Sequence, residues 1–467
     1  MATVLFLDHF WIENLGIMQL SAVLKRAGHA SHVTTGGIGA IARAVERYKP
    51  DLLAFSCFMT DYQWHLERAA ECKQRFPELP IIFGGYAPTF LTSSFCVDQV
   101  DYLCRGEGEE PLLHLVEYLE TGRPAMEDLN LLCREDGFRA KPFNIVRDLD
   151  RLPWVDRDLF DFGRDNPHPF MILTSRGCVH SCSFCTNTLM REEAGPGTPK
   201  VRFRALEDVL AELRELKKTR KVSEIKFVDY TFNQDQARML ELLERYNCEI
   251  DLPFKFDIRG NFFTEDQARL LARSKCLLVH FGIESGSERL RNQVLNKNLS
   301  DAQILAAAEL LHRYKLRFVT FNMWGLPHET LADAERTIEL NHRVRPLSPV
   351  STLYLPFAGH PLTRQSIEEG LVDPAELPLV QFEPWRSCTS IVKNPDARRI
   401  EMVMYFSHLS VVFPATWPFF RWLARTVRPN WFFRFLYAAI TLGFIVRWGP
   451  HFAWIVAKYS FLRLLRR

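Results

Sequence analysis

The sequence predicts an α/β protein built from two successive series of strands and helices, followed by a helical tail. Short apolar runs alternate with amphipathic stretches over the first 120 residues, the alternation resumes near residue 170, and proline-broken helical segments follow from about residue 360. A chain of 467 residues is long enough for about two to four domains, each with its own core. We therefore divide it into a first α/β domain (1–122), a linker (123–167), a second α/β domain (168–362) and a helical C-terminal region (363–467).

The first series indicates a doubly wound, Rossmann-like parallel sheet. Its apolar runs lack polar alternation, as strands do when helices cover both faces of a parallel sheet. The expected strands are Thr3–Leu7, Ala30–Thr34, Asp51–Ser56, Pro80–Phe83 and Val100–Cys104. The expected helices are Leu15–Ala27, Ala40–Tyr48, Tyr62–Phe76 and Glu109–Leu119. Ligands bind at the carboxyl ends of such strands, so loops 56–61, 84–88 and 105–110 are candidate binding loops.

The second series indicates a partial (β/α)6 barrel. The linker before it carries four prolines among mixed charges and is expected to be irregular. The expected strands are Phe170–Thr174, Glu224–Phe227, Phe254–Asp257, Leu277–Phe281, Arg317–Met323 and Ser351–Leu355. The expected helices are Leu206–Lys218, Gln234–Tyr246, Glu265–Ala272 and Asp301–Tyr314. Six parallel strands with crossover helices fit a partial barrel, and its functional residues should lie at the strand ends.

Three cysteines stand apart from the other eight. Cys178, Cys182 and Cys185 lie within eight residues of each other, after the first strand of the second series. A [4Fe-4S] cluster takes one thiolate per iron, so three cysteines leave one iron open for a substrate or cofactor. A structural zinc site that uses the same thiols with His180 is the alternative.

The cysteine spacing, with Phe184 before the third cysteine, resembles the signature of the radical SAM enzymes. Two further motifs resemble those of the branch that carries an N-terminal cobalamin domain. They are Phe281–Glu288, with Lys297 after it, and Trp324–Thr330. The resemblance implies a [4Fe-4S] cluster on the three cysteines that binds and cleaves S-adenosylmethionine.

The resemblance also implies which residues bind S-adenosylmethionine. Asp229 lies in Phe227–Phe232, which is similar to the second-strand motif that receives the amino group of the cofactor. Arg259 follows the third strand, where its guanidinium could pair with the carboxylate of the cofactor. Glu284 and Ser285 belong to the fourth-strand motif. Structural roles are the alternative: Asp229 and Asn233 as helix caps, Glu284 as the partner of Arg259, Gly325–Pro327 as a turn, and His360 as a residue only near the site.

The first domain is similar to the cobalamin-binding domains of this branch. The residues that carry the similarity lie at the strand ends, with Ser56, Gly84, Gly85 and Glu107 as candidate contacts. Glycines there allow the backbone to approach a large ligand closely. The Asp-x-His-x-x-Gly loop, which in many cobalamin proteins supplies a histidine to the cobalt, is absent, because Asp8 and His9 are followed by Phe-Trp-Ile. We therefore expect cobalamin without a protein histidine on the cobalt. A domain that keeps the fold without the cofactor is the alternative.

The C-terminal region has a separate charge pattern. Residues 1–401 contain 49 basic and 56 acidic residues, whereas residues 402–467 contain nine basic residues, no acidic ones and five of the ten tryptophans. Arg421, Arg425 and Arg428 share one helical face, and a last amphipathic piece follows Gly449. We interpret the tail as a dock on an anionic membrane surface. A helical cap on the barrel, with arginines that face solvent, is the alternative.

Together these features predict a cobalamin-dependent radical SAM enzyme that methylates an unactivated carbon of a lipophilic molecule, such as an isoprenoid, lipid or tetrapyrrole. Cyclisation, ring rearrangement or oxidation without methyl transfer is the alternative chemistry, and a zinc-containing nucleic-acid-binding protein is the alternative class. Because the second domain is not basic and the tail is strongly apolar, no nucleic-acid partner is expected. We expect flavodoxin or ferredoxin as electron donor. The N-terminal stretch lacks the features of a signal peptide, so we expect a cytoplasmic protein, peripheral on the inner face of the membrane.

Overall fold

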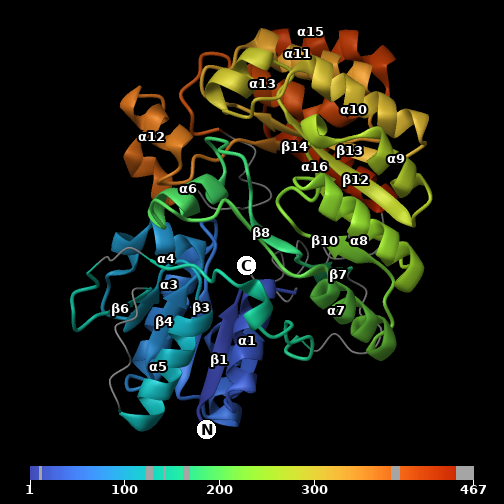
Figure 1. Cartoon of the computed structure of the whole chain (residues 1–467). Helices are drawn as coiled ribbons and strands as arrows, with labels where there is room; N and C mark the ends of the chain where they lie inside the picture. Colours follow the sequence, from blue (N-terminus) through green and yellow to red (C-terminus); the bar gives the residue numbers. More distant parts are fainter. Residues whose placement is uncertain (10–12, 123–129, 140–142, 161–168, 380–389, 449–467) are drawn as a thin grey trace.

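The computed structural model describes residues 1–467 except for 10–12, 123–129, 140–142, 161–168, 380–389 and 449–467. Two α/β units and a group of C-terminal helices make up the molecule (Figure 1). The last amphipathic piece predicted after Gly449 lies outside the described residues, as do parts of the linker. The domain boundaries given above stay predictions from the sequence.

The N-terminal unit is a six-stranded sheet in the order β2-β1-β3-β4-β5-β6, parallel except for β6. Its strands are β1 (Thr3–Asp8), β2 (Ala30–Thr35), β3 (Leu52–Ser56), β4 (Ile81–Gly84), β5 (Tyr102–Cys104) and β6 (Leu131–Cys133). Its helices are α1 (Leu15–Arg26), α2 (Ile38–Tyr48), α3 (Tyr62–Arg75), α4 (Tyr86–Phe90) and α5 (Glu109–Thr121). Alternate residues of β1 enter two separate cores: Leu5 packs with residues of α2 and α3, and Phe6 with residues of α1 and α5. This confirms the doubly wound arrangement.

The linker contains one strand that the sequence did not predict. Leu131–Cys133 forms β6 and pairs antiparallel with β5, so this part of the segment expected to be irregular closes one edge of the N-terminal sheet. Asn130 fixes the entry to β6, because its amide donates to the carbonyl oxygens of Glu107 and Asn144, both at 2.9 Å. β6 is an edge strand followed by the charged residues 134–136 and by no amphipathic helix, so it lacks the strand–helix alternation that marks the other strands.

The second unit is a sheet of six strands whose spatial order follows the chain, as in a partial barrel. The strands are β7 (Phe170–Ile172), β10 (Ile225–Phe227), β11 (Phe254–Ile258), β12 (Cys276–Glu284), β13 (Phe318–Trp324) and β14 (Pro349–Leu353), and all neighbours are parallel. The helices are α6 (Thr186–Glu193), α7 (Leu206–Thr219), α8 (Gln236–Glu249), α9 (Glu265–Ala272), α10 (Asp301–Arg313) and α11 (Leu331–Val344). Phe227, Phe256 and Phe281 point outward and pack under these helices, which forms the largest core. The polar residues between them therefore face the inside of the barrel.

A two-stranded antiparallel pair, here called the β8–β9 hairpin, encloses the cysteine loop and α6. β8 (Ser175–Gly177) pairs antiparallel with β9 (Val201–Phe203), outside the barrel sheet. The cysteines thus follow β8, and not β7 directly as the sequence predicted. Gly177 has a φ of +96°, and a Cβ at this position would lie 2.3 Å from the carbonyl oxygen of Lys200. The hairpin therefore requires glycine directly before Cys178.

The C-terminal helices cap the barrel. They are α12 (Pro361–Glu368), α13 (Ala397–Tyr405), α14 (Ser407–Val412), α15 (Trp417–Thr426) and α16 (Trp431–Trp448). Apart from α12, these helices pack with β13, β14 and α11 around Trp324, Ile338 and Tyr405, and Figure 1 shows α13 and α15 beside α11 at the end remote from the N-terminal unit. Much of the region read as a membrane dock is thus part of a hydrophobic core, which corresponds to the cap alternative.

The arginines of the tail differ from both interpretations. Arg421 and Arg425 pair with Glu335 of α11 instead of facing only solvent or lipid. Arg428 lies beyond the end of α15, so it does not share the helical face predicted for all three. None of the helices in the described ranges is long and apolar enough to cross a membrane.

Candidate active site between the two α/β units

The cysteine loop is held by residues from several elements. The Ser183 amide donates to the carbonyl oxygen of Leu295 at 3.0 Å, and its hydroxyl donates to that of Val294 at 2.7 Å. Asn296 donates to the carbonyl oxygen of Ser181 at 2.8 Å, and Arg191 of α6 donates to the Ser181 hydroxyl at 2.6 Å. The loop is therefore preorganised by backbone-directed hydrogen bonds.

Each of the three thiols lies beside one polar group. Cys178 Sγ is 3.5 Å from the Thr231 hydroxyl, Cys182 Sγ is 3.5 Å from Arg259 Nη1, and Cys185 Sγ is 3.8 Å from the Asn187 amide nitrogen. Burial raises the pKa of Cys185, with a further increase from the other two cysteines. Donors beside sulfur stabilise thiolates and tune the potential of an iron–sulfur cluster, so Arg259 beside Cys182 and Asn187 beside Cys185 suit cluster ligands.

The geometry does not fit the zinc alternative. Among the residues that the structure describes, no three Cys, His, Asp or Glu side chains are close enough together to hold one metal ion. The ring of His180 instead stacks on Phe262, with centroids 5.2 Å apart. A [4Fe-4S] cluster places each thiolate on a different iron, so its ligands need not converge on one point.

Arg259 presents an unsatisfied donor next to the cysteine loop. Its Nε donates to Asn261 Oδ1 at 3.0 Å, and Nη2 is buried without a hydrogen-bond partner. Asn233 fixes the backbone of Arg259 by two hydrogen bonds of 3.0 Å and is not a helix cap, since Asp235 caps α8. A buried guanidinium N–H without a partner is costly, so this position fits an anionic ligand such as the carboxylate of S-adenosylmethionine.

Glu284 ends β12 in an unusual backbone conformation. Its φ is +69°, in the left-handed region that only a few per cent of residues other than glycine adopt. Its Oε1 accepts from Lys297 Nζ at 2.8 Å, so the pairing with Arg259 considered from the sequence does not form. A Cβ on Gly282 would lie 2.6 Å from Glu284 Oε1, so glycine there leaves room for the carboxylate. Such strain persists at functional sites where the surroundings enforce it.

Asp229 and Ser285 are buried and occupied by internal hydrogen bonds. Asp229 accepts from the hydroxyls of Thr174 at 2.8 Å and Ser175 at 2.5 Å, which ties the end of β10 to the chain after β7. Burial raises the pKa of Asp229, and these hydrogen bonds oppose the increase. The Ser285 hydroxyl accepts from the Ser287 amide at 3.2 Å. Asp229 therefore does not cap a helix, and both residues shape the strand ends that a cofactor would contact.

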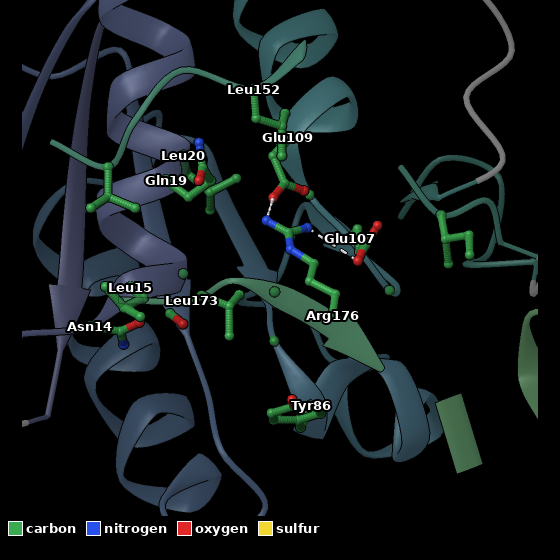
Figure 2. A pocket seen from close by; sticks show the side chains of 18 of the residues that line it. Asn14, Leu15, Gln19, Leu20, Tyr86, Glu107, Glu109, Leu152, Leu173 and Arg176 are labelled. Atoms are coloured by element: carbon green, nitrogen blue, oxygen red, sulfur yellow. Dashed lines mark hydrogen bonds and ion pairs between the residues drawn. The ribbon is translucent and has the colours of Figure 1, made fainter. Parts of the chain in front are cut away.

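A cavity of about 670 Å³ lies between the N-terminal unit and the barrel (Figure 2). The strand-end residues predicted from the sequence line it on the N-terminal side: Ser56, Gly84, Gly85 and Glu107. The barrel side contributes residues that flank the cysteine loop, namely Arg176, Gly177, Asn187, Met190, Arg191 and Tyr230, whereas the three cysteines, Asp229, Arg259, Glu284 and Ser285 are not in the lining. The volume is in the upper half of the range of ligand pockets, about 300–1,000 Å³.

The wall of the N-terminal unit fits a large ligand. Gly85 has a φ of +99°, and a Cβ there would lie 2.6 Å from the carbonyl oxygen of Cys57, so only glycine allows the chain to turn against this wall. The described residues that line the cavity include no histidine, and His9 instead stacks on Trp64 at 4.4 Å. Glycines, apolar side chains and open space at the carboxyl edge of the sheet suit cobalamin.

The structure also brings together residues that the sequence did not single out. Tyr86 of α4 and Tyr230 after β10 join the two units at the wall of the cavity, with hydroxyl oxygens 2.5 Å apart. Arg176 reaches across from β8 to Glu107 and Glu109 (Figure 2). His360 lies near the site, but its ring nitrogens contact the Thr186 hydroxyl and the Phe357 carbonyl oxygen, both at 3.2 Å, which indicates a bracing role.

Comparison with known proteins agrees with both halves of this site. The model of the Radical SAM superfamily matches residues 172–340, and the B12 binding domain model matches residues 9–116. An uncharacterized methyltransferase of Pyrococcus horikoshii is 27% identical over 342 residues, which cover 71% of this chain and 72% of the relative. The anaerobic magnesium-protoporphyrin IX monomethyl ester cyclase of Rubrivivax gelatinosus is 24% identical over 76% of this chain and 64% of its own.

Among solved structures, the chain is similar to the radical S-adenosylmethionine methyltransferase TsrM from Kitasatospora setae, solved with its tryptophan substrate and a SAM analogue. The TM-score is 0.67, with 16% identity over 100% of this chain and 99% of that one. At this identity the match supports the fold, whereas the two family models identify the domains. The chain belongs to the cobalamin-binding radical SAM enzymes.

Proposed function

We propose that the protein is a cobalamin-dependent radical SAM methyltransferase that acts on a lipophilic small molecule. The observation that carries this proposal is the single cavity lined both by the strand ends of the cobalamin-binding unit and by the surroundings of the cysteine loop. Methyl transfer to carbon requires the two cofactors to face the same substrate, and proximity in one cavity serves this purpose.

The proposed ligands follow from the site. Cys178, Cys182 and Cys185 hold the [4Fe-4S] cluster, and S-adenosylmethionine lies against Asp229, Arg259, Glu284 and Ser285. Cobalamin lies against Ser56, Gly84 and Gly85. When bound, the cluster supplies the electron that cleaves S-adenosylmethionine, and methylcobalamin supplies the methyl group. The chain itself binds the carboxylate through Arg259, keeps the backbone close to the ligands through glycines, and excludes water.

The lining supports a lipophilic substrate. Apolar side chains from both units enclose much of the cavity, among them Leu15, Leu20, Leu152, Met171, Leu173 and Val228. One relative is named for magnesium-protoporphyrin IX monomethyl ester, a tetrapyrrole with a large apolar ring system. That relative is a cyclase, so cyclisation or oxidation is the second candidate, while the methyltransferase relatives favour methyl transfer.

Turnover products separate the two chemistries. Reconstituted enzyme is incubated anaerobically with S-adenosylmethionine, a reductant such as reduced flavodoxin or ferredoxin, and lipid extract, with and without methylcobalamin. Methylation predicts equal amounts of S-adenosylhomocysteine and 5′-deoxyadenosine, and a product 14 mass units heavier that requires methylcobalamin. Deoxyadenosine alone, with a substrate changed in mass by loss of hydrogen, would instead establish oxidation or cyclisation.

We further propose that the C-terminal cap contacts an anionic membrane surface on the cytoplasmic side. Exposed aromatic side chains support this: Phe419, Trp422, Trp431, Phe432 and Phe435 are all more than half open to solvent. Aromatic side chains of this kind favour the interface between water and lipid. The adjoining region contains basic and no acidic residues, which favours anionic headgroups.

Vesicle flotation tests the membrane contact on the full chain. Trp422→Ser, Trp431→Ser and Phe435→Ser together should reduce binding to vesicles of anionic lipid at least about tenfold, since three aromatic side chains that would contact the lipid are lost. Tyr118→Ser is the control, because it removes an exposed aromatic side chain of the N-terminal unit and leaves the cap unchanged. Equal flotation of the wild type and the aromatic variant would contradict the proposal.

A further inference from the structure

The β8–β9 hairpin, which encloses the cysteine loop, places two arginines directly opposite each other. Arg176 of β8 is paired in register with Arg202 of β9, so both side chains point to the same face. Both are largely buried, with 19% and 11% of their side chains exposed. Like charges directly opposite on antiparallel strands destabilise the pair, and burial increases the cost. The hairpin therefore needs an acidic partner that its own strands do not supply.

Glu107 of the N-terminal unit is that partner. Its two carboxylate oxygens accept from Arg202 Nη1 and Nη2, both at 2.8 Å, and Oε1 also lies 3.1 Å from Arg176 Nη1. Arg176 Nη2 donates to Glu109 Oε1 at 2.6 Å (Figure 2). The Val146 amide completes the set, at 2.6 Å from Glu107 Oε2. Burial alone would raise the pKa of Glu107, but the two arginines lower it below its usual value.

These contacts connect the cobalamin-binding unit to the cysteine loop over a very short path. Glu107 lies in the loop between β5 and α5 and lines the cavity. Arg176 is two residues before Cys178, and the backbone of Gly177 between them approaches Lys200 too closely to admit a Cβ. A displacement of Arg176 is therefore expected to move the Cys178 thiol as well.

We propose that Glu107 is a positioning residue that couples docking of the cobalamin-binding unit to the placement of the cysteine loop. It was expected from the sequence to contact cobalamin, but its carboxylate oxygens are occupied by Arg176, Arg202 and Val146. Without its charge, the opposed arginines separate, the hairpin opens and the loop loses its register with the cavity. The inference rests on the proposed function for the identity of the ligands, while the electrostatic coupling itself is a property of the chain.

Hydrogen exchange on the protein before cluster reconstitution tests the coupling. Glu107→Gln keeps the shape of the side chain and removes its charge. We expect amides of residues 175–177 and 201–203 to exchange at least about tenfold faster, because two buried arginines are left without their shared partner. Glu117→Gln is the matched control, since Glu117 lies exposed on α5, and it should exchange as the wild type does.

The double variant Glu107→Gln, Arg202→Gln removes one of the two opposed charges and should recover most of the protection. Such non-additivity distinguishes relief of repulsion from general loss of structure. After reconstitution, Glu107→Gln should also yield more 5′-deoxyadenosine per methylated product than the wild type.

Unchanged exchange in Glu107→Gln, or a double variant less protected than the single one, would overturn the coupling whatever the enzyme catalyses. Failure of the wild type to bind iron or to methylate would instead contradict the proposed function and leave the exchange result standing.

Discussion

Glu335 joins the C-terminal cap to the barrel, and its replacement by glutamine should weaken the cap. Its side chain is only 4% exposed and accepts three hydrogen bonds, from Arg421 Nη2 at 2.6 Å and from Arg425 Nε and Nη2 at 2.8 Å. Hydrogen bonds to charged groups contribute about 1.5–3 kcal/mol each when fully buried. The two arginines are 41% and 51% exposed, so solvent screening reduces the total. We expect Glu335→Gln to cost the cap about 1–3 kcal/mol.

Native-state hydrogen exchange of α15 measures this loss locally, which a global unfolding curve of a multidomain chain does not. A loss of about 1–3 kcal/mol corresponds to exchange about 5- to 150-fold faster. Glu339→Gln is the matched control, because Glu339 lies exposed one turn further along α11, and its effect should stay within about 0.5 kcal/mol. Equal exchange in both variants would refute the interpretation of the tail as a cap clamped by Glu335.

The same pair predicts a pH dependence. Burial would raise the pKa of Glu335, but hydrogen bonds and charge from Arg421 and Arg425 lower it below its usual value. A carboxylate with a lowered pKa in the folded state contributes stability above its unfolded pKa of about 4.3. The contribution is lost as the pH falls through the folded pKa. The difference between wild type and Glu335→Gln in the free energy of opening of α15 should thus be largest at pH 7 and become smaller below about pH 4.

Three further predictions address the site and its surroundings. Cys182→Ala should lower the iron content after anaerobic reconstitution from about four per chain to below one, whereas Cys248→Ala, on the exposed face of α8, should leave it unchanged. Arg259→Lys should weaken S-adenosylmethionine binding about tenfold or more by titration calorimetry at unchanged iron content, because an ammonium replaces a planar guanidinium; equal affinity would refute the assigned contact. Burial raises the pKa of Glu329 to about 8, so between about pH 4.5 and 8 the folded state retains a proton that the unfolded state releases. As the pH rises from about 4.5 to 8, the free energy of unfolding of the wild type should therefore fall more steeply than that of Glu329→Gln. Thermal unfolding midpoints that change equally with pH in the two proteins would contradict this.

The parallel strands could be predicted from the sequence, because strands that are buried on both faces appear as short continuous runs of apolar residues. The parallel strands of both sheets lie within a few residues of their expected bounds, and the glycines expected at the strand ends line the cavity. The cysteine spacing identified the loop, since cluster ligands need a fixed local arrangement. The strands β6, β8 and β9 could not be found in this way, because they pair antiparallel outside the alternation of parallel strands and helices, and β8 and β9 contain polar residues.

Contacts between segments that are far apart in the chain could not be predicted from the sequence either. Glu107 and Arg202 are 95 positions apart, and Glu335 and Arg425 are 90 apart, so nothing local marks them as partners. The basic, aromatic composition of the tail permits both a membrane dock and a cap, because each needs apolar surface flanked by arginine. Only the position of Glu335 shows where two of the arginines are engaged.

The most direct test of the central claim is the cofactor content of one preparation of the full chain, reconstituted anaerobically with iron, sulfide and hydroxocobalamin. The account predicts about four irons and one cobalamin per chain, both retained through gel filtration. Replacing Gly84 with leucine should abolish cobalamin retention and leave the iron content intact, because Gly84 lines the cavity and a Cβ there makes only an ordinary contact, 3.7 Å from Cys104 Cβ. A preparation that retains one zinc and neither iron nor cobalamin would contradict the account.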